Sequence, residues 1–105
     1  MVIVETPTFT RLIRDLLDDD SYRLLQIELA ENPEKGAVIR GTGGIRKLRW
    51  SGTGRGKRGG TRVIYYWAKS KDIVLMLVAY AKNEETTLTP AQGKVLRKLV
   101  EEEFG

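Results

Sequence analysis

Three cationic side chains stand at alternating positions in two segments with the pattern of β-strands. Lys47 and Arg49 lie two residues apart within residues 45–50, and Arg62 lies near the start of residues 61–68. Alternate residues of a strand project from the same face of a sheet, so the three cations can share one face. No acid stands near them in the sequence, and cations grouped without counter-charges favour a polyanionic partner.

The charge of the whole chain is divided in the same way. The net charge is +4, but residues 1–39 carry −4, residues 72–105 carry −2, and residues 40–71 carry ten basic residues and no acid. Such a segment repels itself unless a polyanion binds to it. The alternative is a solvated face that only improves solubility, which would not explain why the two signs are segregated. We therefore expect RNA binding along a basic, glycine-rich hairpin between Arg40 and Lys71.

The chain has no cysteine and no histidine. This excludes cysteine nucleophiles, thiolate metal sites and Ser-His-Asp chemistry, and we expect neither a metal nor a cofactor. A lysine among other cations loses its proton more readily, so Lys47 or Lys82 could act as a base. Tyr65, Tyr66 or Tyr80 could supply a hydroxyl.

The length and periodicity predict a single domain over residues 1–105. The expected order is β-α-α-β-β-β-α, with strands at residues 2–4, 45–50, 61–68 and 73–81. The helices are expected to begin after Thr6, at the acidic run 18–21 and after Thr89. The fold class is α+β, an antiparallel sheet with helices packed on one side. The first ten residues lack the pattern of a secretory signal, and the longest apolar run has nine residues. A membrane helix needs about 20, so we expect a cytoplasmic protein without membrane contact.

The glycine-rich segment at 54–59 has the letters G-x-G-x-x-G of a dinucleotide-binding turn. A strand pattern follows it instead of the required helix, and Lys57 precedes Arg58 instead of Ser or Thr, which also excludes a P-loop. Two interpretations remain open: a hairpin tip that binds phosphate through its cations, or a loop with solubilising charge. The aromatic residues 65–67 alternate sides, so at least one can stack on a base from the basic side.

Three segments, at residues 41–49, 56–66 and 80–84, resemble the RelE/HigB toxins of bacterial type II toxin–antitoxin systems, most closely the HigB branch. The resemblance implies a RelE-like, microbial-ribonuclease-like fold that enters the ribosomal A site and cleaves mRNA. In that reaction the ribose 2′-OH attacks the adjacent phosphate and leaves a 2′,3′-cyclic phosphate. The resemblance also implies a cognate antitoxin, expected to be a helix-turn-helix DNA-binding protein.

The resemblance assigns roles to individual residues. Lys47 and Arg49 match the paired basic strand residues of RelE, Arg62 matches the arginine of the next strand, and Lys82 matches the strand-end lysine, so these four are the candidate catalytic residues. RelE has an arginine after that lysine, where this chain has Asn83, and a tyrosine further on, where it has Thr89. The general base and acid therefore stay open. The expected RNA-binding residues are Arg46, Arg55, Lys57, Arg58, Tyr65, Tyr66 and Asn83.

Two other functions use the same basic sheet. A non-catalytic module would bind RNA or DNA through its charge alone, and a protein-interaction module would dock an acidic partner. Only an enzyme needs particular cations, because arginine binds phosphate through two parallel hydrogen bonds and lysine does not.

Overall fold

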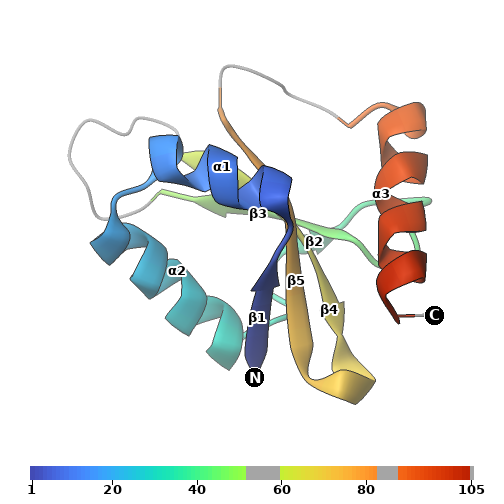
Figure 1. Ribbon diagram of the computed structural model, residues 1–105, viewed down its shortest axis with the longest axis horizontal. Coiled ribbons are helices and arrows are strands. Elements are labelled where there is room, and N and C mark those ends of the chain that lie inside the picture. The colour runs from blue at the N-terminus through green and yellow to red at the C-terminus, as the bar shows by residue number, and fades with distance from the viewer. Residues whose placement is uncertain (52–59, 83–87, 105) are drawn as a thin grey trace.

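A computed structural model of the chain describes residues 1–51, 60–82 and 88–104. A five-stranded sheet with the order β1-β5-β4-β3-β2 lies at its centre, flanked by helices (Figure 1). The elements are β1 (Val2–Glu5), α1 (Pro7–Leu16), α2 (Asp19–Glu31), β2 (Ala37–Val38), β3 (Arg46–Trp50), β4 (Thr61–Ala68), the 3₁₀ turn η1 (Lys69–Lys71), β5 (Ile73–Ala81) and α3 (Pro90–Phe104). Within the described residues no helix is long and apolar enough to cross a membrane.

The α+β class and the predicted order of the elements are confirmed, with two differences in the sheet. It is mixed and not wholly antiparallel, because β1 runs parallel to β5, with Val2 opposite Ile73. A short strand, β2, pairs with the start of β3 and was not predicted. Strand direction and a two-residue pairing both depend on the neighbour in the sheet, and the local sequence pattern does not contain that neighbour.

The predicted helix starts are confirmed by their caps. The Thr6 hydroxyl accepts a hydrogen bond from the Phe9 backbone N–H, and the Asp18 carboxylate accepts one from Ser21. The capping box at α3 is reciprocal, since Thr89 accepts from the Gln92 backbone and the Gln92 side chain accepts from the Thr89 backbone. Each cap satisfies a backbone group that a helix end leaves without a partner.

The sheet has two different faces. Leu48, Val63 and Tyr65 belong to a buried cluster with residues of α1 and α2. Ile45 and Ile64 belong to a second cluster. Since neighbouring residues of a strand project from opposite faces, the two clusters lie on opposite sides of the sheet. We call the first side the α1/α2 face and the second side the cationic face, for the charges described below.

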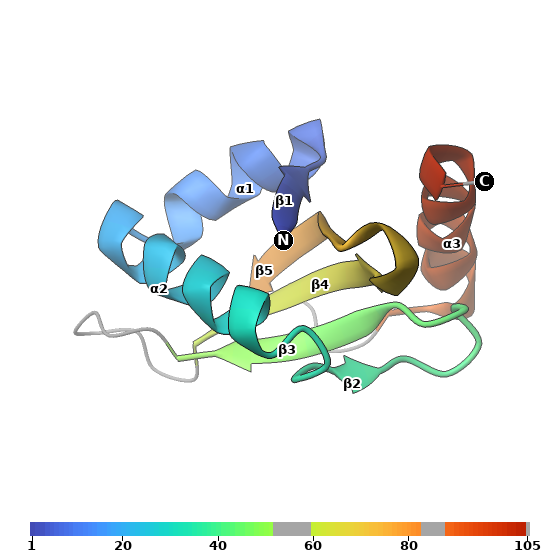
Figure 2. The same ribbon diagram turned by 90° about the horizontal axis from the view of Figure 1, so that it is seen from below.

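The helices divide between these clusters. Helices α1 and α2 pack together on one side of the sheet, as predicted, and bury Phe9, Ile13, Leu25 and Leu29 there (Figure 2). Helix α3 instead contacts the second cluster through Val100, with Leu96 and Phe104 packed beside it. The sheet is therefore supported by apolar contacts on both faces, which fixes its strands in place.

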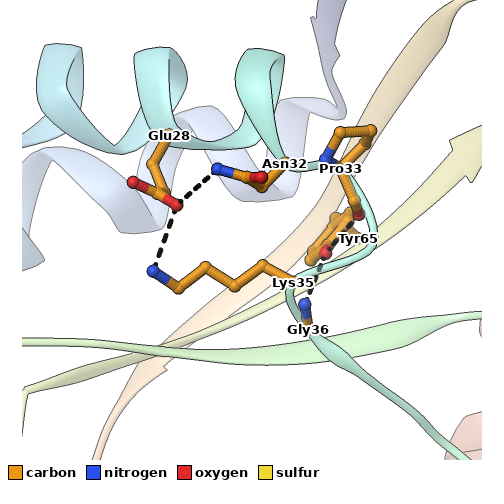
Figure 3. A network of polar contacts seen from close by, with 6 residues as sticks. All are labelled: Glu28, Asn32, Pro33, Lys35, Gly36 and Tyr65. Atoms are coloured by element: carbon orange, nitrogen blue, oxygen red, sulfur yellow. Dashed lines mark hydrogen bonds and ion pairs between the residues drawn. The ribbon is translucent and has the colours of Figure 1, made fainter.

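A polar network fastens the connection between α2 and β2 to the middle of the sheet (Figure 3). The fully buried Tyr65 donates its hydroxyl hydrogen to the Pro33 carbonyl oxygen at 2.6 Å and accepts from the Gly36 N–H at 2.9 Å. Burial raises the pKa of Tyr65, so the hydroxyl stays a donor over the physiological range. A Cβ on Gly36 would lie 2.9 Å from the Tyr65 ring, so only glycine fits at this close approach.

The same connection is tied down at the protein surface. The Glu28 carboxylate accepts hydrogen bonds from the Asn32 amide and the Lys35 ammonium, each at 3.1 Å (Figure 3). These bonds, with that from Lys35 the stronger, lower the pKa of Glu28. The end of α2 and the segment after it are thus held at two points, one exposed and one buried.

We predict that Tyr65→Phe destabilises the fold by about 1–3 kcal/mol, because it leaves the Pro33 carbonyl and the Gly36 N–H buried without their partner. Urea unfolding followed by circular dichroism measures this loss. Tyr66→Phe is the matched control, since among the described residues the neighbouring hydroxyl makes no hydrogen bond to be lost. Equal stability of the two variants would contradict the role assigned to the network.

Candidate functional site

Three of the predicted catalytic residues meet on one face of the sheet. Leu48 points into the α1/α2 cluster, so Lys47 and Arg49 project from the cationic face. Arg62 projects from the same face, because it alternates with the buried Val63. The register places Arg49 directly opposite Arg62, and Lys47 opposite Ile64. We call Lys47, Arg49 and Arg62 the cationic strip.

The strip is accessible and strongly positive. Arg49 is exposed, and Lys47 and Arg62 are half-buried. Directly opposite residues of an antiparallel pair have Cβ atoms about 5 Å apart, and like charges in such a pair are destabilising. No ion pair found among the described residues involves Lys47 or Arg49. An anion bound over the strip would relieve this repulsion, and arginine suits a phosphate because its donors form a planar fork.

The fourth predicted catalytic residue borders the strip. Lys82 follows directly after β5, is exposed, and donates its backbone N–H to the Gly60 carbonyl oxygen at 3.3 Å. Gly60 directly precedes β4, so the backbone of Lys82 lies one residue beyond the pair formed by Thr61 and Ala81. Three strands therefore bring cations from distant parts of the sequence to one end of the cationic face.

Tyr80 is the tyrosine that the register places beside these cations. It is the Cα partner of Arg62 and is half-buried on the cationic face. Tyr66 lies on the same face but packs its ring 5.8 Å from that of Phe104 in α3, away from the strip. Of the three tyrosines that could supply a hydroxyl, Tyr80 lies beside the strip, but its hydroxyl oxygen is buried from solvent.

Two predicted RNA-binding residues have structural roles, which corrects the sequence-based prediction. Tyr65 is fully buried on the α1/α2 face, so its ring cannot stack on a base. Arg46 lies on that face as well, and its guanidinium donates to the carbonyl oxygens of Glu34 at 3.0 Å and Gly36 at 2.8 Å. The sequence contained a sign of the position of Arg46, because this residue alternates with the apolar Leu48 and Trp50 and therefore shares their face of the sheet.

Arg55, Lys57, Arg58 and Asn83 lie outside the described residues, so their predicted contacts with RNA stay predictions. In the part of the chain that the structure describes, no group of three or more acidic side chains is placed to hold a metal ion.

Comparison with known proteins bears on the family and the fold of this chain. A family model described as "RelE toxin of RelE / RelB toxin-antitoxin system" matches residues 1–104. Among solved structures, a free form of the Escherichia coli toxin RelE carrying two arginine-to-alanine substitutions is similar in fold. It shares 18% sequence identity with a TM-score of 0.56, over 78% of this chain and 83% of the other.

The structural likeness supports the fold alone, at this level of identity. The family match covers nearly the whole chain and describes RelE toxins as a group, so the closer resemblance to the HigB branch stays a prediction. A match over residues 1–104 together with a RelE-like sheet leads to one conclusion: this chain belongs to the RelE toxin family of toxin–antitoxin systems.

Proposed function

We propose that this toxin is a metal-independent endoribonuclease that cleaves mRNA in the ribosomal A site and so inhibits translation. The observation that carries the proposal is the cationic strip, where Arg49 and Arg62 face each other across two strands with Lys47 beside them. A strip of this kind can grip the phosphate backbone of RNA. It is also suited to stabilise the extra negative charge that a phosphate gains in the transition state.

The proposed reaction needs no group beyond the protein and the RNA. The ribose 2′-oxygen forms a bond to the adjacent phosphorus, and the bond from phosphorus to the 5′-oxygen of the next nucleotide breaks. A base takes the 2′-OH proton, and an acid gives a proton to the leaving 5′-oxygen. Lys47 and Lys82 are the candidates for these two roles, while Arg49 and Arg62 hold the phosphate.

We predict that Lys47→Ala, Arg62→Ala and Lys82→Ala each lower the rate of mRNA cleavage on programmed ribosomes by about 10²–10³-fold. Each variant loses one group that holds the phosphate or moves a proton. Mapping of transcript 5′ ends by primer extension measures cleavage, and circular dichroism checks the fold.

Lys71→Ala is the matched control, because it removes the same charge from the exposed turn η1 at the other end of the sheet. It should cleave at the parent rate. If the folded triple variant of Lys47, Arg62 and Lys82 still inhibited growth like the parent, this site would have to be abandoned.

A charge-preserving change separates the enzyme from a module that only binds nucleic acid. We predict that Arg62→Lys cleaves at least about tenfold more slowly, because lysine cannot form two parallel hydrogen bonds to a phosphate. Its affinity for RNA, measured by filter binding at fixed salt, should change less than about twofold. Unchanged cleavage would contradict a specific role for the guanidinium, and tight RNA binding without cleavage by the parent protein would favour the non-catalytic module.

A further inference from the structure

Helix α3 has two apolar stripes, and one of them faces solvent. Leu96 and Val100 pack against the sheet, as expected of an amphipathic helix. Val95 and Leu99, one turn apart on the neighbouring stripe, are 64% and 40% exposed. The helix lies at the side of the molecule opposite α2 (Figure 1). Nothing in the proposed cleavage reaction uses this second stripe.

The exposed stripe borders a concave surface. Val95 and Leu99 line a cavity of about 760 Å³, and Val4 of β1, which is 37% exposed, lines it from the other side. Contiguous exposed apolar side chains that line a concavity are typical of an interaction site. The charges on the same helix indicate which partner would fit there.

The charges of α3 are divided between its two halves. Residues 90–98 hold three cations and no acid, and residues 99–104 hold three acids and no cation. The six side chains, all of them exposed, are Lys94, Arg97, Lys98, Glu101, Glu102 and Glu103. The helix is therefore basic along its first part and acidic along its last part.

This order of charges is unfavourable for a helix that stands alone. Backbone dipoles make the start of a helix positive and its end negative, so acids are stabilising near the start and cations near the end. The first turn of α3 holds no acid, and the last turn holds no basic residue. Within the described residues an ion pair joins Arg97 to Glu101, whereas Lys98 and Glu102 take part in none. Stability of α3 therefore does not explain its charge pattern.

A second copy of α3 carries the complementary charges. When two copies lie antiparallel, the basic half of each helix lies beside the acidic half of the other, and the two helix dipoles oppose each other. A two-fold axis produces this arrangement and makes the two halves of the interface identical. Lys98 and Glu102 follow Val95 and Leu99 by three residues, so they border the exposed stripe and would face the second copy.

We propose that this chain forms a two-fold symmetric dimer in which α3 packs antiparallel against α3 of a second copy. Val95 and Leu99 of the two copies cover one another, and Lys98 of each copy faces Glu102 of the other. The interface is small, so association is reversible and depends on protein concentration. This inference goes beyond the proposed RNA cleavage and does not depend on it.

The apolar contact is tested with Val95→Asp in the full chain, without RNA or any other protein. Sedimentation equilibrium should show the parent as a dimer at about 100 µM, in keeping with a small interface. A charge buried in the interface should weaken dimerisation by about tenfold or more. Ile27→Asp adds the same charge at a 48% exposed position on α2 and should dimerise like the parent.

The antiparallel arrangement is tested by exchanging charges. Lys98→Glu and Glu102→Lys each place like charges across the interface, so each variant alone should dimerise about fivefold more weakly than the parent. An equimolar mixture of the two variants restores opposite charges at both contacts and should dimerise like the parent. Circular dichroism checks that every variant keeps its helices.

Three results would overturn the proposal. The parent could be a monomer at about 100 µM, a concentration at which small interfaces are occupied, and the stripe would then be left to a different protein. Folded Val95→Asp could dimerise as tightly as the parent, or the mixture of Lys98→Glu with Glu102→Lys could associate no better than either variant alone. None of these measurements involves RNA, so the dimer and the cleavage reaction can fail independently.

Discussion

The register between β3 and β4 is the constraint on which the rest of this structure depends. It sets Arg49 directly opposite Arg62 and at the same time buries Leu48 and Val63 on the other side. A shift of one residue would exchange the faces, so that the cations would enter the core and the apolar side chains would face water. Burial on the α1/α2 face therefore holds together charges that would otherwise separate.

The Tyr65 hydroxyl supports this register from within the core. It binds the segment between α2 and β2 through Pro33 and Gly36, and Arg46 of β3 binds the same segment through its guanidinium. Unsatisfied buried polar groups are costly, so the network selects one position for β3 relative to β4. Tyr65 and Arg46, which the sequence suggested as RNA contacts, are thus part of the scaffold that positions the candidate cations of the strip.

Helix α3 covers one part of the cationic face and leaves another part open. It covers the apolar rows around Ile45 and Ile64 and leaves the strip of Lys47, Arg49 and Arg62 open beyond them. Val95 and Leu99 of the helix line a cavity that Val4 of β1 lines from the other side.

The sequence by itself determined the elements, their caps and the segregation of charge, because periodicity, capping boxes and runs of like charge are local properties. It also identified the cations of β3 and β4 and the RelE resemblance. Only the tertiary structure decided that β1 runs parallel to β5, that Tyr65 and Arg46 lie on the α1/α2 face, and that Tyr80 lies beside Arg62. Each of these features depends on which strand lies alongside and on which face is buried. Such pairings between distant segments cannot be read from the local periodicity of the sequence.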